Sequence, residues 1–529
     1  MSSKIKFTID DLYKTLKRHD VDILKHFNDE KLSDYDYLFY AINSDIMSNA
    51  LNIVINLMID NEASVGVDNN ARAIIEGFVI LKMLGSGAID SEQQKIFRSH
   101  FAIVDYENFK KLIREAKDHP AIVEAKKRYD DAISFLTTHF KCSKKALFEH
   151  FVDVDDPLFY IKKTLKEDIG FVTLLNKYPI FEEHTYRIYE FFSIMIHPRY
   201  VGSESLERSI QKMRQSYTYM VLDYVVKYLK AEKLIVIDDS AKTFDDDFTN
   251  NPLLKNNVNN IFQTILAFDL LTKNLCILKD GVDGFSIFFL TQIRHLLIDM
   301  ELCESLGYNE QVISKYKSFI EMAAIHATIN CVDDIDEFKT LKLAYSFSSK
   351  LQLCEHLKAM NLSNDDFELS GLRELYEQYY RDKFKIATYE EFEKGMKNNS
   401  LYFLDPSNQK KSYNKYVREA INEVIPLESL QKQMFDMYKL SKDMNHASGY
   451  NFNSSPGITE FYSHTIMKSV FDWIINFIVN ASAVVDEMDH KTNLEPVLEM
   501  FRTMAEFENE AMKKIGKKYE EDYNKYSNQ

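Results

Sequence analysis

The amino-acid sequence predicts an all-α protein. Gly (14) and Pro (9) are scarce in a chain of 529 residues, so residues that form turns are too few for a many-stranded β fold. Apolar residues recur three and four positions apart over long stretches such as 37–60 and 203–230, which is the helical period. A chain of this length exceeds one ordinary hydrophobic core, and we expect several domains.

The first half of the chain is predicted to form one helical unit. Residues 1–35 are expected to be a polar N-terminal helical segment that starts after Thr8, because Thr followed by acidic residues is a helix start signal. The unit spans 36–235 and is followed by a linker at 236–258, which is rich in Asp and Asn. Its helices are expected at 37–60, around Arg72 after a turn at 66–68, at 97–116, twice within 121–170, at 181–197 and at 203–230.

The second half, 259–488, is predicted to be a divergent copy of the first unit that packs against it with pseudo-symmetry. The interval from Arg294 to His446 is longer than the interval from Arg72 to His197, which indicates an insertion near 362–412. The polar residues of this insertion predict a surface excursion. Residues 489–529 are predicted to form a charged helical tail, which docks back, faces a partner or stays solvated. Helices of the second unit are expected from residue 259, around Arg294, at 315–329, toward His446 and at 458–485.

Two stretches carry the evidence for duplication, 189–200 (YEFFSIMIHPRY) and 438–450 (YKLSKDMNHASGY). Each is an aromatic and apolar helical run that reaches a Ser and then a His, and a helix-breaking Pro or Gly follows. An Arg lies upstream of each run on another apolar helix, Arg72 in the first half and Arg294 in the second. The repeated order of Arg, Ser and His makes these positions functional candidates.

The two His residues, His197 and His446, are the better candidates for chemistry. Each is expected in the last turn of a helix, where the macrodipole should raise its pKa, which suits a general acid. Ser193 lies four residues before His197 and shares its helix face, whereas the Ser before His446 is five residues away. The Ser is therefore the weaker candidate. The structural alternative is a His that caps the last helix carbonyls.

Arg72 and Arg294 can each be interpreted as structural or as functional residues. Arg72 and Glu76 are four residues apart among apolar neighbours, which predicts a partly buried salt bridge. Arg294 has Ile298 at the matching position and Asp299 one step further. A buried Arg needs an acidic partner, so a structural role is one interpretation. The functional alternative is an Arg that reaches the same pocket as the following His, with Glu76 beside it.

An Arg early in a helical unit and a Ser-x-x-x-His near the end of a later helix resemble an uncharacterised family of bacterial all-helical proteins. The pattern is also loosely similar to the HEPN-type ribonucleases of toxin and abortive-infection systems. Those nucleases carry the Arg and the His a few residues apart on one helix, whereas the nearest Arg before His197 is Arg187, ten residues away. The resemblance implies an intracellular bacterial defence or stress protein, with antiviral defence as the setting.

The resemblance also implies roles for individual residues. RNA would be bound or cleaved without a metal or cofactor, with His197 or His446 as acid or base on the 2′-OH. Arg72 or Arg294 would steady the phosphate. The residues implied to bind the substrate in a local basic pocket are Ser193, Arg199, Arg208 and Lys442.

Composition limits the other classes of function. The net charge of −16 argues against a protein that coats nucleic acid non-specifically, although a local basic pocket is compatible with it. The five Cys are scattered and predict neither a disulfide framework nor a zinc site. Asp443 and His446 have the spacing of di-iron ligands, but the first half does not repeat it, so no metal site is expected. Nucleotide-binding, zincin and α/β-hydrolase motifs are absent from the sequence.

Location and partners follow from the same sequence. The N-terminus lacks the apolar core of a signal peptide, and no stretch has about twenty clean apolar residues, so we expect a cytoplasmic protein without a membrane span. The alternative to an RNA-directed protein is a non-enzymatic helical scaffold or sensor. Such a scaffold would bind a protein partner, or a second copy of itself, through the C-terminal helix.

Overall fold

The computed structural model describes residues 8–27, 32–60, 65–112, 120–151, 171–197, 199–232, 243–244, 246, 261, 263–271, 284–330, 332, 334–358, 369–399, 401–404, 406, 413–425, 428–444, 456–487 and 494–527. Helices account for nearly all of them, and no β-strand occurs within these ranges. The all-α prediction is therefore confirmed. The predicted pseudo-symmetric duplication stays a prediction.

The helices of the first half largely follow the predicted order. Gly66–Asp68, expected to be a turn before the Arg72 helix, form the first turn of that helix instead. The bounds are α1 (Ile9–Phe27), α2 (Asp34–Asp60), α3 (Gly66–Gly85), α4 (Ser91–Leu112), α5 (Pro120–Phe140), α6 (Lys144–His150), α8 (Phe171–Lys177), η1 (Glu182–His184), α9 (Thr185–Met195) and α10 (Glu204–Ala231).

The predicted start signal at Thr8 is confirmed by its hydrogen bonds. The Asp11 backbone N–H donates to Thr8 Oγ1 at 3.1 Å, and the Thr8 N–H donates to Asp11 Oδ2 at 3.0 Å. This reciprocal arrangement satisfies backbone donors that a helix start leaves unpaired. Ser33 and Asp36 cap the start of α2 similarly, with the Asp36 N–H donating to Ser33 Oγ at 3.1 Å. Local sequence thus fixes where the first two helices begin.

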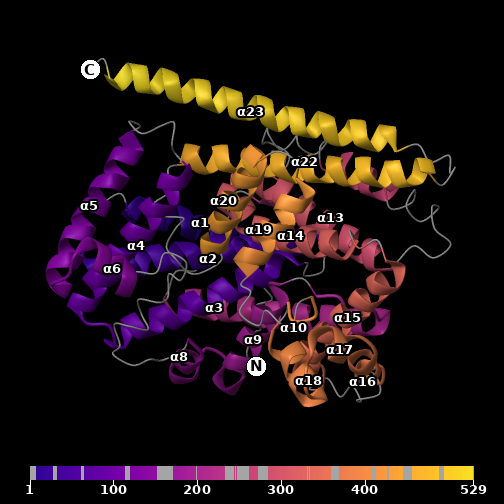
Figure 1. Cartoon of the computed structure of the whole chain (residues 1–529). Coiled ribbons are helices and arrows are strands. Elements are labelled where there is room, and N and C mark those ends of the chain that lie inside the picture. Colours follow the sequence, from indigo (N-terminus) through magenta and orange to yellow (C-terminus); the bar gives the residue numbers. More distant parts are fainter. Residues whose placement is uncertain are drawn as a thin grey trace.

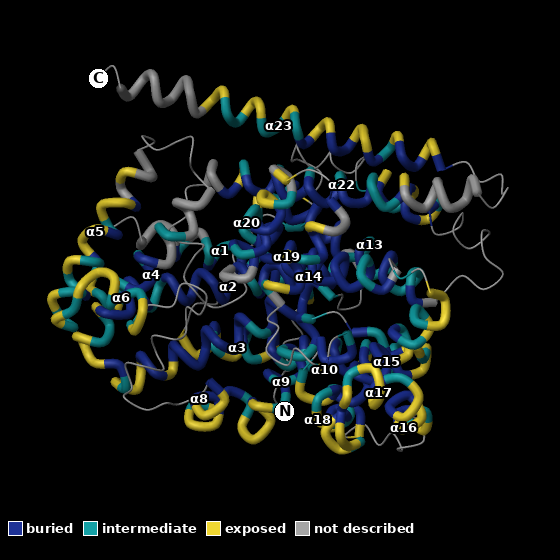
Figure 2. Tube along the Cα trace, in the orientation of Figure 1, coloured by how far each residue is buried: buried dark blue, intermediate teal, exposed yellow. Residues whose placement is uncertain are grey.

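The helices of the second half surround α14 (Figure 1). Every residue from Gln311 to His326 is buried, so this helix has no solvent face, and Figure 2 shows it as the dark centre of the fold. The bounds are α13 (Gly284–Ser305), α14 (Asn309–Asn330), α15 (Ile335–Lys358), α16 (Leu372–Leu375), a π-helical turn (Tyr376–Tyr380), α17 (Arg381–Phe384), α18 (Tyr389–Asn398), α19 (Tyr413–Val424), α20 (Glu428–Met444), α22 (Pro456–Glu487) and α23 (Glu495–Ser527).

Two large hydrophobic cores hold these helices together. One is built mainly by α1–α3 and α8–α10, and the other by α13–α16, the π-helical turn, α18–α20, α22 and α23. A small third core lies between α4, α5 and α6. Leu302, Leu353 and Leu357 come from the second half but are buried in the first core. The two halves are therefore joined by shared packing.

The segment near 362–412, predicted to be a surface excursion, is largely exposed or half-buried in the part that the structure describes, but it also has a buried face. The segment packs on α15 and contributes buried aromatic side chains, among them Tyr380 and Phe392, to the second core. The Tyr380 hydroxyl donates a hydrogen bond to the Phe403 carbonyl, and Gln352 Nε2 of α15 donates to the Met396 carbonyl at 3.0 Å. Alternation of polar and aromatic residues concealed a buried aromatic face.

The charged tail forms the long helix α23, which lies along α22 at one edge of the fold (Figure 1). Val497, Phe501 and Met504 are buried against the second core, so the docked alternative is the one observed for this part of the helix. No helix among the described residues is both long enough and apolar enough to cross a membrane.

Candidate functional site

Arg72 on α3 forms the predicted salt bridge with Glu76. The Arg72 Nε lies 3.0 Å from Glu76 Oε1, and the Glu76 side chain is fully buried. Tyr189 on α9 completes the group, because its hydroxyl donates to the same Glu76 oxygen at 3.0 Å. The Arg72 guanidinium also lies over the Tyr189 ring, 5.6 Å from its centroid. The Arg72 charge is thus neutralised inside the first half.

His197 lies just beyond the end of α9, where its N–H donates to the Ile194 carbonyl at 3.4 Å. Its Nδ1 is 2.7 Å from Oε2 of Glu321, a fully buried residue of α14. The Tyr438 hydroxyl on α20 donates to the other oxygen of Glu321 at 2.9 Å. Of the His197–Glu321 pair, only the imidazole is partly exposed, with 24% of its side-chain surface accessible.

Two buried cations lie beside this pair. Arg199 and Lys317 are 7% and 6% exposed, and the charges of both act on His197. We call the group the His197 cluster; its members are His197, Arg199, Lys317, Glu321 and Tyr438. Two cations and one carboxylate therefore surround the imidazole.

The prediction that the helix end raises the pKa of His197 is wrong. Burial lowers its pKa to about 4, and the charges of Lys317 and Arg199 act in the same direction, although Glu321 opposes them. For Glu321, burial alone would raise the pKa, but the charges of His197 and Lys317 and the hydrogen bonds from His197 and Tyr438 outweigh it, so its pKa lies below the ordinary value. A neutral imidazole can donate Nδ1–H to the carboxylate and accept a proton at Nε2.

The remaining predicted residues do not converge on one pocket. Arg294 lies 3.2 Å from Asp269 and keeps 30% of its side chain exposed. Arg208 pairs with Glu204 on the exposed face of α10, while the Ser193 hydroxyl is buried. His446 lies outside the described residues. Lys442 belongs to α20, but its side chain is likewise outside the description.

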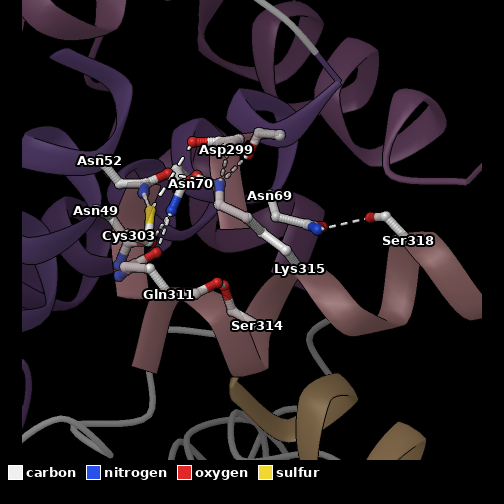
Figure 3. A network of polar contacts seen from close by, with 11 residues as sticks. Asn49, Asn52, Asn69, Asn70, Asp299, Cys303, Gln311, Ser314, Lys315 and Ser318 are labelled. Carbon is white, nitrogen blue, oxygen red and sulfur yellow. Dashed lines mark hydrogen bonds and ion pairs between the residues drawn. The ribbon is translucent and has the colours of Figure 1, made fainter. Parts of the chain in front are cut away.

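A separate polar network joins the two halves (Figure 3). At its centre, the fully buried Lys315 places its Nζ 2.6 Å from Asp299 Oδ2 on α13. The same amine donates to Asn52 Oδ1 on α2 at 2.6 Å and to the Gly66 carbonyl on α3 at 3.3 Å. One amine therefore ties α14 to three other helices.

Amide side chains extend this Lys315 network. Asn70 Nδ2 donates to Asn49 Oδ1 at 2.8 Å and to Gln311 Oε1 at 2.7 Å. Asn69 Nδ2 donates to Ser318 Oγ at 2.9 Å, and Figure 3 shows this pair further along α14. Such bonds satisfy polar groups that packing has removed from water. All of these side chains are buried except Asn49, which is half-buried, so the network is a structural joint.

Metal-ligating residue types gather elsewhere, between α13, α22 and α23. Glu304, His464 and Glu508 bring one ligand atom each within 4.8 Å of the others, and the charges of Glu304 and Glu508 act on the carboxyl of Glu301. We call these four residues the Glu301 cluster. His464 Nδ1 lies 3.1 Å from Glu304 Oε1 and 2.6 Å from Glu508 Oε2.

Sequence reasoning missed Glu321 and Lys317, although a signal was present. The stretch 315–329 is apolar enough for the interior, yet it carries charged residues four apart, Lys317 and Glu321. A charge on a buried helix must be paired. The pattern alone cannot identify the partner of Glu321, because His197 is 124 residues away in the sequence.

Comparisons with protein-family models, curated proteins and solved structures gave no match to this chain. No relative therefore indicates a function, and a function can be inferred only from the geometry of the chain's own residues. Of the groups described above, the His197 cluster combines a partly exposed imidazole, an orienting carboxylate and two neighbouring cations.

Proposed function

We propose that the His197 cluster binds an RNA phosphodiester and that the protein cleaves RNA without a metal, with His197 as the general base. The contact of 2.7 Å between His197 Nδ1 and Glu321 carries the proposal, because a carboxylate at Nδ1 orients the ring and leaves Nε2 to accept a proton. An effector of this kind would serve in bacterial defence, as the HEPN resemblance implies.

The proposed reaction is transphosphorylation by the neighbouring 2′-OH. His197 Nε2 takes the 2′-OH proton, the oxygen forms a bond to phosphorus, and the bond from phosphorus to the 5′-oxygen breaks. The leaving oxygen takes a proton from water, and the products are a 2′,3′-cyclic phosphate and a 5′-OH. Arg199 and Lys317 supply positive charge beside the phosphate, which stabilises charge that develops in the transition state.

The test uses the full chain, total RNA and tRNA in EDTA. Parent protein is expected to generate 2′,3′-cyclic phosphate ends, and His197→Ala is expected to reduce the rate by about 10²-fold or more, the usual contribution of a general base. His184→Ala is the matched control, because His184 is close in the sequence but 56% exposed beside Glu183. Equal rates for both variants would exclude His197 as the base.

A pH profile separates a catalytic role from a structural one. With a pKa lowered to about 4, His197 is already deprotonated at pH 6, so the acid limb of the rate should fall near pH 4 rather than near 6.5. Glu321→Gln keeps a hydrogen-bonding side chain but removes the orienting charge. It should lower kcat more than it changes KM, with unchanged far-UV circular dichroism.

The second candidate is a non-enzymatic scaffold or sensor. Its support is that Arg72, a predicted catalytic residue, is already engaged by Glu76 and Tyr189. A partner, or a second copy, would dock on α23, where Phe507 is 45% exposed beside the buried face. A chain that leaves RNA intact, and whose oligomeric state or partner binding changes in Phe507→Glu, would favour this function.

A further inference from the structure

The Glu301 cluster shares no residue with the His197 cluster and has no part in the proposed RNA chemistry. Glu301 and Glu304 lie one turn apart on α13, His464 comes from α22, and Glu508 comes from α23. One ligand atom each from Glu304, His464 and Glu508 lies within 4.8 Å of the others. Three helices thus bring carboxylates and an imidazole to one point.

The cluster contains three carboxyl groups and one imidazole. Glu304 and Glu508 each form an ion pair with the imidazole of His464. Glu301 and Glu508 are only 5% and 3% exposed, so water does not screen them. A buried carboxylate without a compensating charge is unfavourable and calls for a proton or a cation.

Glu301 provides an independent observation. Its Oε1 accepts a hydrogen bond from Thr264 Oγ1 at 2.6 Å. Its Oε2 is buried and has no hydrogen-bond partner among the described residues. The charges of Glu508 and Glu304 act on this carboxyl. A buried carboxylate oxygen without a hydrogen-bond partner can be satisfied by a cation.

We propose that the Glu301 cluster binds one divalent transition-metal ion. Ligand atoms that share an ion at about 2.1 Å lie about 3 to 3.5 Å apart. The 3.1 Å contact between His464 Nδ1 and Glu304 Oε1 has that spacing, the 2.6 Å contact with Glu508 Oε2 is shorter, and all three ligand atoms lie within 4.8 Å of one another. Oxygen ligands with one imidazole and no thiolate suit manganese, iron or zinc rather than calcium or magnesium.

The surroundings resemble a second coordination shell. Ser463 Oγ donates to Glu304 Oε1 at 2.9 Å, as Thr264 does to Glu301. Hydroxyl groups in such positions orient carboxylate ligands. Because Glu508 comes from α23 and the other ligands from α13 and α22, the ion would fasten the C-terminal helix to the second core.

The experiment uses the full chain after removal of metal with EDTA and dialysis. Titration with Co²⁺ alone, followed by visible absorption and by metal analysis, should show one ion per chain. Glu301→Gln and Glu508→Gln should each weaken Co²⁺ binding at least tenfold. Glu510→Gln is the matched control, because Glu510 lies on the same helix but pairs with Lys513 and is 60% exposed.

Glu301→Gln is the decisive variant, because it preserves the acceptor for Thr264 and removes an uncompensated acid. It should fold as well as the parent even if Glu508→Gln does not. If His464 alone balances the cluster, Glu301→Gln will raise thermal stability and leave Co²⁺ binding unchanged. That result, or the absence of stoichiometric binding to the parent, overturns the proposal.

Discussion

Replacement of Lys315 by Met tests whether the polar joint between the halves stabilises the fold. The Lys315 ammonium is fully buried and contacts Asp299 and Asn52, both at 2.6 Å. Met fills a similar volume but leaves the Asp299 carboxylate, itself 2% exposed, without its cation. Breaking a buried ion pair in this way typically destabilises by about 3 to 5 kcal/mol, a large share of the roughly 5 to 15 kcal/mol of a folded protein.

Urea unfolding followed by two probes measures this effect. Trp473, the single Trp, is buried in the second core, so its fluorescence reports that half, while far-UV circular dichroism reports all helices. Both curves should shift to lower urea in Lys315→Met, because the amine touches helices of both halves. Asn in place of Asp299 in the double variant removes the orphaned charge and should recover part of the loss.

The matched control is Lys227→Met. Lys227 forms an ion pair with Asp223 at 2.6 Å, but the two side chains are 70% and 62% exposed. Exposed pairs contribute about 0 to 1 kcal/mol, so this variant should unfold close to the parent. If Lys315→Met shifts the transition no more than Lys227→Met, the network does not hold the halves together.

Three further predictions concern single residues. Gly66→Ala should destabilise, because its Cβ would lie 2.1 Å from Asp299 Oδ2, whereas Gly85→Ala, with no atom within 4 Å, should be neutral or stabilising in thermal melts. Burial raises the pKa of Glu207 to about 7. Its carboxyl therefore contributes full stability below its unfolded pKa of about 4.5 and loses that contribution as pH rises through 7. Glu207→Gln should consequently stabilise by about 2 to 3 kcal/mol at pH 9 and not at pH 4.5, and equal melting shifts at the two values would contradict it. Tyr438→Phe removes the hydrogen bond to Glu321 and should destabilise by about 1 kcal/mol; unchanged urea unfolding would show that this bond contributes nothing.

Much of the helical fold was predictable from the sequence, because its signals are local. Scarce Gly and Pro, the helical period and the Thr8 start signal each predict a feature that the structure contains. The Arg72–Glu76 salt bridge was predictable for the same reason, since its residues are one turn apart. The buried face of the segment near 362–412 was not predicted, because Tyr side chains carry a polar group and still pack in a core.

The composition of the His197 cluster could not be predicted. His197 was a candidate, but its pKa depends on burial and on charges from a distant helix. A helix C-terminus does favour the imidazolium, but burial and the charges of Lys317 and Arg199 lower the pKa of His197 by more. Likewise, the sequence gives no ligand spacing for the Glu301 cluster, because its members come from three helices that only tertiary packing brings together.

The position of α14 has a consequence for how the chain acquires its structure during synthesis. The first half leaves the ribosome before α14 exists, so Asn52, Asn69 and Asn70 then face no partner from it. Helix α14 packs against α20 and α22, which are synthesised after it. Contacts between such distant segments slow folding. The last helices to be synthesised therefore complete the interior of the molecule, and an incomplete chain exposes polar and apolar surfaces that the finished protein keeps hidden.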